Sequence, residues 1–218
     1  MPVIHYSCLD EKLEQYIVDH SSPEDELLQE LTRETHLKVM HPRMISGHIQ
    51  GLTLKMLSRM IQPNLILEIG TYTGYSAICL VSGLKPGGML HTIEINDELQ
   101  HFASKYIKKA GLENKIKQHI GDAKVLISKI PDDIDLVFLD GDKTEYLDYY
   151  NAVFEKLKKG GYILADNVLW NGKVIDELKE NDKFTRGILD FNEFVQKDPR
   201  VENVVLPLRD GIMICRKR

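Results

Sequence analysis

The sequence predicts an α/β fold with an open, mostly parallel sheet behind a helical N-terminal segment. Three observations predict it. Apolar residues recur at helical spacing up to residue 62, short apolar runs then alternate with helical segments, and the last two runs are separated only by a tight turn. Short connections between alternating strands and helices imply parallel strands joined by right-handed crossovers.

The first part of the chain, residues 9–62, is predicted to be helical. In LDEKLEQYIVDH, Leu13, Tyr16 and Ile17 fall on one helical face. Ser22 and Pro23 provide cap and first-turn signals for a second helix, and SGHIQGLTLKMLSRMI repeats apolar residues at intervals of three and four. We therefore expect one domain, with a helical cap at residues 1–62 and the core at residues 63–218.

Five short apolar runs are predicted to be strands, at residues 65–70, 88–96, 115–123, 134–141 and 162–167. Helical segments separate them, and YLDYYNAVFEKLKKGG would carry its lysines at the helix C-terminus, where they suit the dipole. A further helix, FTRGILDFNEFVQKD, precedes the runs VENVVLPL and GIMICRKR. The turn signal Arg209-Asp210-Gly211 between these two runs predicts that the last strand is antiparallel.

The composition is that of an ordinary globular protein. The chain has 218 residues, 43% hydrophobic and 28% charged, with a net charge of −5. A core of this size needs no disulfide or metal for folding. The acidic balance argues against a nucleic-acid-binding protein, which would need a basic face.

The cysteines and the N-terminus predict a reduced, cytoplasmic protein. Cys8, Cys79 and Cys215 are widely spaced and form no CxxC pair. The N-terminus lacks the basic and apolar regions of a signal peptide, and no apolar run approaches 18 residues. We therefore expect no membrane segment.

The carboxyl ends of the predicted strands are where an open parallel sheet binds its ligands. The first strand ends in LEIGTYTGYS, where Gly70 and Gly74 are too far apart for the G-x-G-x-x-G motif of dinucleotide-binding proteins. Glu68 stands two positions before Gly70 and would repel a pyrophosphate, but it could receive an ammonium group or ribose hydroxyls. The glycines alone are equally compatible with an ordinary strand-to-helix turn.

The next two strand ends continue this pattern. The second strand ends in Glu94, which could accept hydrogen bonds from a ribose diol, although a solvated acid is the common alternative. The third ends in Asp122 and Ala123. Acids without a phosphate-binding loop suit a cofactor that combines adenosine with an amino-acid tail. S-adenosylmethionine is such a molecule.

The fourth and fifth strand ends carry DGDK and ADN. Adjacent strands would bring Asp140 close to Asp166 and Asn167. These side chains offer only hard oxygen donors, which suit Mg²⁺ or Ca²⁺, and a dication would relieve the repulsion between the carboxylates. The alternative is that one acid caps a helix and the other pairs with Lys143; both interpretations remain open.

Together these segments resemble the cation-dependent O-methyltransferases of the caffeoyl-coenzyme A and catechol type: LEIGTYTGYS, TIEIN, GDA, VFLDGDKTEYLDYY and GGYILADNVLWNGKV. The resemblance extends through DPRVENVVLPLRDGIMICRK and covers roughly residues 40–218. The combination of DxDK, DN and LWNG is highly specific, whereas no single segment is. The resemblance implies a Rossmann-like, doubly wound sheet of seven strands with the last strand antiparallel.

The resemblance also implies residue roles. It assigns cofactor contacts to Ser46, Glu68, Gly70, Thr71, Ser76, Glu94, Ala123 and Asp142. It assigns the metal to Asp140, Asp166 and Asn167, with Asp140 also near the substrate, and the general base to Lys143. Trp170 and Asn171 match positions that line the acceptor pocket, although Trp170 could instead be a packed loop aromatic. Glu94 departs from the aspartate of plant relatives, and the first 40 residues, which help to decide the acceptor, match poorly.

The expected activity is transfer of a methyl group from S-adenosylmethionine to one hydroxyl of a small catechol-type acceptor. A bound dication, with Mg²⁺ first and Ca²⁺ or Mn²⁺ as alternatives, would favour ionisation of a chelated phenol. Proximity to that cation would disfavour the protonated ammonium of Lys143, which could then take the proton. The alternatives are methylation of RNA, or a cofactor-binding module without activity. A homodimer is expected from the resemblance, with the apolar N-terminal helices as its interface.

Overall fold

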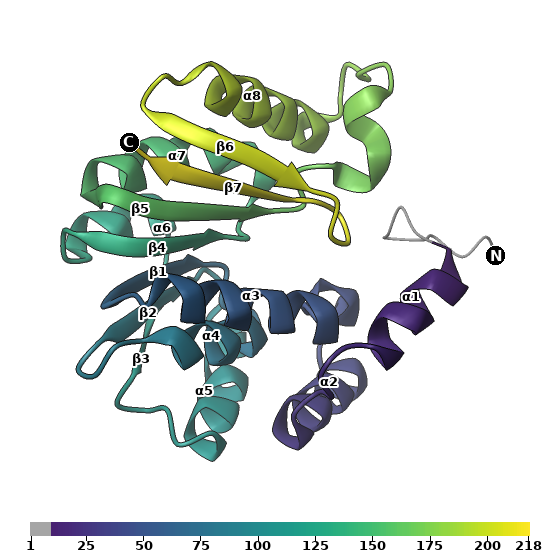
Figure 1. Ribbon diagram of the computed structural model, residues 1–218, viewed down its shortest axis with the longest axis vertical. Helices are drawn as coiled ribbons and strands as arrows, with labels where there is room; N and C mark the ends of the chain where they lie inside the picture. The colour runs from purple at the N-terminus through teal and green to yellow at the C-terminus, as the bar shows by residue number, and fades with distance from the viewer. Residues whose placement is uncertain (1–9) are drawn as a thin grey trace.

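The computed structural model describes residues 10–218 and is built around one seven-stranded sheet (Figure 1). The strand order is β3-β2-β1-β4-β5-β7-β6. The strands are β1 (Leu65–Ile69), β2 (Met89–Glu94), β3 (Ile116–Ile120), β4 (Ile134–Leu139), β5 (Leu157–Asp166), β6 (Val201–Leu206) and β7 (Ile212–Lys217). Strands β1 to β5 pair in parallel, and β7 is antiparallel to both β5 and β6. The predicted fold class is therefore confirmed.

Helices cover both faces of the sheet. The helices are α1 (Glu11–Asp19), α2 (Glu26–Lys38), α3 (His48–Ile61), α4 (Tyr75–Leu80), α5 (Gln100–Lys109), α6 (Ala123–Leu126), α7 (Tyr146–Lys156) and α8 (Lys183–Lys197). One hydrophobic cluster joins the sheet to α2, α3, α4 and α5, and a second joins it to α6, α7 and α8. The result is three layers, with α1 projecting from the body (Figure 1).

The side chains of the central strands alternate between these two clusters, as the period of a strand requires. In β4, Leu136 and Phe138 face the cluster with α3, whereas Val137 and Leu139 face the cluster with α7. All four are fully buried. Strands buried on both faces read as continuous apolar runs, which is why IDLVFL predicted a strand without alternating polarity.

The structure corrects the prediction for the start of the fifth strand. Helix α7 ends at Lys156, and β5 begins at Leu157, not at Tyr162. Leu157 pairs with Ile134 and Tyr162 with Leu136, so the extra residues form an irregularity in the ladder. Lys158 therefore lies in the strand, where it forms an ion pair with Asp135. Burial of Leu157 in the core outweighs the helical pattern of the segment.

The N-terminal region contains three helices separated by breaks. Helix α2 begins at Glu26 and is capped by Asp25, whose carboxylate accepts a hydrogen bond from the Leu27 amide at 2.9 Å, so the predicted cap at Ser22 is wrong. A 3₁₀ helix, η1 (Pro42–Met44), leads into α3. The prediction about Cys8 lies outside the described residues. Within residues 10–218, no helix combines the length and apolarity that a membrane-spanning segment needs.

Candidate functional site

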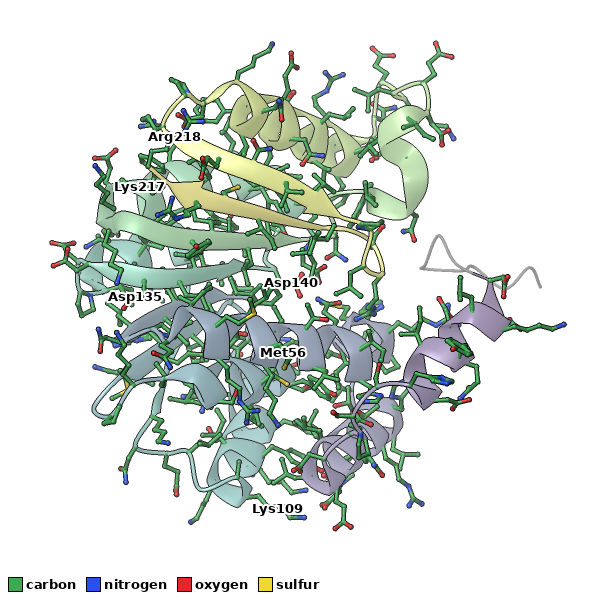
Figure 2. The ribbon with its side chains drawn as sticks, viewed as in Figure 1. Met56, Lys109, Asp135, Asp140, Lys217 and Arg218 are labelled. Carbon is green, nitrogen blue, oxygen red and sulfur yellow. The ribbon has the colours of Figure 1, made fainter. Side chains whose placement is uncertain are left out.

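A large cavity opens at the carboxyl ends of the parallel strands. Its volume is about 1560 Å³, and its walls include Gly70 after β1, Glu94 at the end of β2, Asp140 after β4 and Asp166 at the end of β5. Figure 2 labels Asp140 beyond the end of β4, at the edge of the sheet. This edge lies where the strand order reverses around β1, the usual ligand position in such sheets. Pockets for one drug-sized molecule measure roughly 300–1,000 Å³, so this cavity has room for two reactants.

The structure brings most of the predicted site residues to this cavity. Its lining includes Gly70, Glu94, Ala123, Asp140, Asp142, Lys143, Asp166, Asn167, Trp170 and Asn171. Four predicted cofactor residues, Ser46, Glu68, Thr71 and Ser76, are buried and do not line it. The roles of all these residues remain predictions at this point.

The ends of β1 and β4 approach each other closely at Gly70. Its φ is +101°, and a Cβ atom there would lie 2.4 Å from the carbonyl oxygen of Asp140. The Asp140 amide in turn donates to the Ile69 carbonyl at 2.8 Å. Only glycine permits both the backbone angle and the approach, so the turn does more than connect a strand to a helix.

Glu68 is fully buried beneath this turn. Its Oε2 accepts a hydrogen bond from the Thr92 hydroxyl at 2.5 Å, whereas its Oε1 is buried without a hydrogen-bond partner. Burial raises the pKa of Glu68 to about 8, and the hydroxyls of Ser76 and Thr92 offset only part of this rise. Glu68 is therefore enclosed by protein beneath the turn and does not itself line the cavity.

Two backbone amides hold the side chain of Glu94 in place at the carboxyl end of β2. Its Oε2 accepts from the Tyr72 amide at 2.8 Å, and its Oε1 accepts from the Asn96 amide at 2.9 Å. Each oxygen keeps one lone pair free for a further donor. The carboxylate is therefore oriented in the way that recognition of two neighbouring hydroxyls requires.

Asp142 and Ala123 occupy the neighbouring loops. The Asp142 Oδ1 atom accepts from the amide and the hydroxyl of Thr144, both at 2.8 Å, and so caps the 3₁₀ helix η5 (Lys143–Glu145). Ala123 begins α6 behind the cap Asp122. The alternative for DGDK is thus observed in both parts, since Asp142 is a cap and Asp140 pairs with Lys143 at 2.8 Å. The second oxygen of Asp142 remains available to a ligand.

Lys143 lies inside the cavity wall and contacts two oxygen atoms. Its Nζ donates to Asp140 Oδ1 at 2.8 Å and to the Tyr146 hydroxyl at 2.7 Å. Only 9% of its side chain is exposed. The Tyr146 hydroxyl also lies 3.1 Å from the Leu139 carbonyl and 3.0 Å from the Asp166 carbonyl. The ammonium group is therefore fixed, unlike that of an ordinary surface lysine.

Asp166 and Asn167 face the same region from the end of β5. The Asp166 Oδ1 atom accepts from the Asn167 amide at 2.8 Å, and Asn167 adopts a left-handed φ of +60°. Left-handed backbone in a residue other than glycine is uncommon and occurs often at functional sites. Trp170 and Asn171 also have positive φ. Three of the five consecutive residues from 167 to 171 therefore have a strained backbone, and these three belong to the cavity wall.

Three carboxylates share this end of the cavity, and the third is Asp210. Burial raises the pKa of Asp140 to about 6; Lys143 opposes the rise and Asp166 adds to it. Burial also raises the pKa of Asp210, although the Asn171 amide donates to its Oδ1 at 2.5 Å. Lys143 and Arg209 each offset part of this rise. A dication bound between the carboxylates would offset more of the repulsion between them.

The donor set fits a hard dication. Asp140, Asp166 and Asn167 provide carboxylate and amide oxygens from two adjacent strand ends. In the described part of the chain, no group of three or more His, Cys, Asp and Glu side chains is placed to hold a metal ion. A cation at this position would therefore depend on the Asn167 amide and on water or substrate oxygens as well as on two carboxylates.

Part of the cavity lining is apolar. Trp170 and Phe184 lie with ring centroids 6.2 Å apart, and Met40 and Met44 line the cavity with them. The Trp170 Nε1 atom is buried without a hydrogen-bond partner. Aromatic walls beside a polar cluster suit a flat acceptor with hydroxyl groups at one edge.

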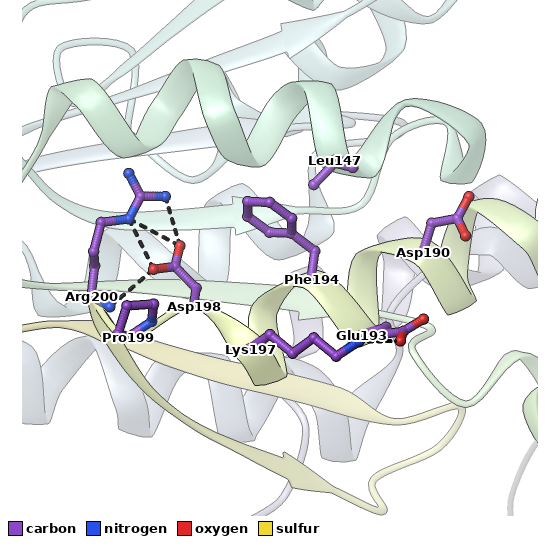
Figure 3. Close-up of a pocket in the computed structure, with 8 residues that line it drawn as sticks. All are labelled: Leu147, Asp190, Glu193, Phe194, Lys197, Asp198, Pro199 and Arg200. Atoms are coloured by element: carbon purple, nitrogen blue, oxygen red, sulfur yellow. Dashed lines mark hydrogen bonds and ion pairs between the residues drawn. The ribbon is translucent and has the colours of Figure 1, made fainter.

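A second, smaller cavity of about 520 Å³ lies between α7 and α8 (Figure 3). Its charged groups are largely satisfied by each other. Arg200 contacts Asp198 through Nε and Nη2, the latter at 2.6 Å, and Lys197 pairs with Glu193. These pairs leave no convergent group for a ligand, so the first cavity is the candidate site.

Sequence reasoning missed four residues of the site: Gln50, Tyr146, Arg209 and Asp210. Asp210 had been interpreted only as part of the RDG turn. Tyr146 follows Lys143 by three positions, a spacing that places both on one side of a helical turn and is a usable signal. Nothing local in the sequence connects Gln50 to Asp166, which lies 116 positions later.

Comparison with known proteins identifies the family. The O-methyltransferase family profile matches residues 18–218. The chain belongs to the S-adenosylmethionine-dependent O-methyltransferase family. It is 36% identical over 227 residues to a caffeoyl-CoA O-methyltransferase of Medicago sativa, covering 98% of this chain and 92% of the relative. The relationship extends over nearly the whole length of both O-methyltransferases.

Solved structures of other O-methyltransferases agree with the fold. An O-methyltransferase from Bacillus cereus in complex with SAH has a TM-score of 0.88 at 29% identity, covering 95% of this chain and 97% of that chain. A Streptomyces achromogenes O-methyltransferase involved in tomaymycin synthesis, in complex with SAM, has a TM-score of 0.87 at 27% identity, covering 94% and 96%. The predicted family and enzyme class are confirmed.

Proposed function

We propose that this O-methyltransferase transfers the methyl group of S-adenosylmethionine to one hydroxyl of a small catechol-type acceptor, with a divalent cation bound beside the acceptor. One observation carries the proposal. Asp140, Lys143, Asp166 and Asn167 line the same cavity as Gly70, Glu94 and Trp170. This shared lining supports a site for donor, cation and aromatic acceptor together.

S-adenosylmethionine supplies an electrophilic methyl group on a sulfonium. We assign its ribose hydroxyls to the free lone pairs of Glu94, and its chain and base to the wall formed by Gly70, Ala123 and Asp142. The buried residues Ser46, Glu68, Thr71 and Ser76 would support that wall from behind. The relatives whose structures contain SAH or SAM support this assignment.

A dication bound by Asp140, Asp166 and Asn167 would supply Lewis-acid chemistry that favours the ionised form of a chelated hydroxyl. We propose Mg²⁺, with Ca²⁺ and Mn²⁺ as alternatives of the same oxygen preference. The protein would contribute an oriented carboxylate, because each oxygen of Asp166 accepts a hydrogen bond, from the Asn167 amide and from Gln50.

Lys143 would act as the general base. In its neutral form, which a nearby dication would favour, the Nζ held 2.8 Å from Asp140 and 2.7 Å from Tyr146 would accept the proton of the acceptor hydroxyl as that oxygen attacks the methyl carbon. The bond between sulfur and the methyl carbon breaks in the same step, and S-adenosylhomocysteine leaves. Trp170 would stack against the acceptor ring and Asn171 would face its substituents. These walls would also exclude water from the reacting atoms.

The acceptor class follows from the cavity and from the relatives. Apolar and aromatic side chains beside three carboxylates favour a neutral aromatic diol, and relatives named caffeoyl-CoA O-methyltransferase support an aromatic acceptor. An RNA acceptor is disfavoured, because carboxylates at the reacting end repel phosphates.

Methyl transfer from labelled S-adenosylmethionine tests the proposal directly. With a panel of catechols, caffeate and caffeoyl-coenzyme A, we expect transfer to vicinal diols in Mg²⁺ and a fall of at least about tenfold in excess chelator, because chelation makes the hydroxyl a better nucleophile. Monophenols serve as the control and should not be methylated. An equal rate of methyl transfer with and without chelator would contradict the metal assignment. If no diol is methylated, structured RNA is the next acceptor to assay.

We also propose that the enzyme is a homodimer that uses its N-terminal helices. Helix α1 buries none of its residues, and Leu13 and Tyr16 on it are 44% and 59% exposed. Burying such side chains in an interface would be favourable. Multi-angle light scattering at micromolar concentration should give twice the mass of one chain, and the mass of one chain would rule this assembly out.

A further inference from the structure

Gln50 connects two charged groups of the cavity. It lies on α3, which covers the opposite face of the sheet from α7, and only 1% of it is exposed. Its Nε2 donates to Asp166 Oδ2 at 2.6 Å, and its Oε1 accepts from Arg209 Nη1 at 3.0 Å. The carboxylate can only accept and the guanidinium can only donate, so these two partners fix the orientation of the amide.

The contact with Asp166 completes the hydrogen bonding of that carboxylate. Oδ1 is held by the Asn167 amide at 2.8 Å, and within residues 10–218 Oδ2 is held only by Gln50. Without Gln50, one oxygen of a buried carboxylate would lose its donor while the like charge of Asp140 acts on the same region. The Asp166 side chain would then rotate away from Asp140. A cation shared by the two carboxylates could not be bound in that arrangement.

The contact with Arg209 extends the connection to the segment before α3. Arg209 Nη1 also donates to the backbone carbonyls of Ile45, at 3.0 Å, and Ser46. One guanidinium therefore ties the turn between β6 and β7 to the segment that carries Ser46. Gln50 links Arg209 to Asp166. The Asp166 carboxylate is therefore connected both to the turn between β6 and β7 and to the segment before α3.

We propose that Gln50 is a positioning residue that orients the Asp166 carboxylate for cation binding through the chain Arg209–Gln50–Asp166. The inference rests on the metal site of the proposed function. Groups that orient the ligands of a metal typically change its affinity by about 10- to 100-fold when they are removed. Gln50 itself contacts neither the cation nor the reacting atoms.

The test is isothermal titration calorimetry of Mg²⁺ into protein saturated with S-adenosylhomocysteine. Gln50→Met keeps the length of the side chain and removes both hydrogen bonds, and its dissociation constant for Mg²⁺ should rise by about 10-fold or more. Gln50→Asn keeps the amide but withdraws it from Asp166 by one methylene, and it should weaken Mg²⁺ binding in the same direction. Either variant suffices if the other does not fold.

Ser58→Ala is the matched control. Ser58 lies fully buried on the same helix and donates to the Leu80 carbonyl at 2.5 Å, far from the cavity lining. We expect it to lower the melting temperature while leaving the Mg²⁺ dissociation constant within about twofold, since distant sites act independently. Affinity for S-adenosylhomocysteine should stay within about twofold in all variants.

Two results would overturn the inference, and they are distinguishable. If wild type binds Mg²⁺, loses it in Asp140→Ala, and Gln50→Met binds it as tightly as wild type, the positioning role is wrong and the metal site stands. If wild type binds no Mg²⁺, or Asp140→Ala binds it unchanged, the proposed metal site fails and the role of Gln50 fails with it.

Discussion

Replacing Asp140 with alanine is expected to abolish Mg²⁺-stimulated turnover while leaving cofactor binding largely intact. Asp140 lines the cavity and lies one residue beyond the end of β4. Asp166 is at the end of β5, the adjacent strand. Lewis-acid stabilisation contributes several kcal/mol and each ~1.4 kcal/mol corresponds to tenfold in rate, so a loss of about 10³-fold is expected. Initial rates across a Mg²⁺ titration measure it.

Asp148→Ala provides the control for this substitution. Asp148 is an exposed acid on α7 that does not line the cavity. It should keep wild-type rates at every Mg²⁺ concentration. Calorimetry with S-adenosylhomocysteine should give similar affinities for wild type and both variants. Wild-type turnover in Asp140→Ala would refute the proposed ligand set.

Replacing Lys143 with methionine is expected to lower kcat by about 10²- to 10⁴-fold, the usual contribution of a positioned general base. Methionine fills the same buried space, where only 9% of the lysine side chain is exposed, but it cannot accept a proton. Lys143 is not one of the proposed metal ligands. Its replacement removes a positive charge that lies 2.8 Å from Asp140, a proposed ligand. Mg²⁺ should therefore bind as tightly as in wild type, or more tightly.

The combination of lost turnover and retained Mg²⁺ binding separates Lys143 from Asp140. Lys124→Met is the matched control, since Lys124 pairs with Glu145 on the surface at 2.5 Å. Surface pairs contribute little, so this variant should keep its rate. A kcat within about threefold of wild type in Lys143→Met would show that the proton goes elsewhere.

The sheet and the polar edge of the cavity could be predicted because their signals are local. Buried parallel strands are continuous apolar runs, and the residues that follow them meet at one edge whatever their side chains are. Asp140 and Asp166 could thus be placed together from the positions of two strands alone. The start of β5 was not predictable in this way, because Leu157 continues the apolar pattern of α7 and only its pairing with Ile134 decides its conformation.

The residues that connect distant segments around the site could not be found from local patterns. Gln50 reaches Asp166 across 116 positions, and Arg209 reaches Ser46 across 163. Both contacts depend on how α3 packs over the sheet, which no spacing along the chain encodes. Asp210 was identified as a turn residue, and its role in the carboxylate cluster appears only when β7 is placed beside β5.

The close approach at Gly70 has a consequence for how this enzyme can change its substrate. The loop after β1 and the loop after β4 are in backbone contact, with no side chain between them. With donor and cation bound as proposed, the main chain would set the separation of the two reactants, and side-chain substitutions would change it little. Variation in the acceptor would then arise at Trp170, Phe184 and Met44, which line the cavity away from this contact. Under this proposal, new acceptors would evolve while the geometry of transfer stays the same.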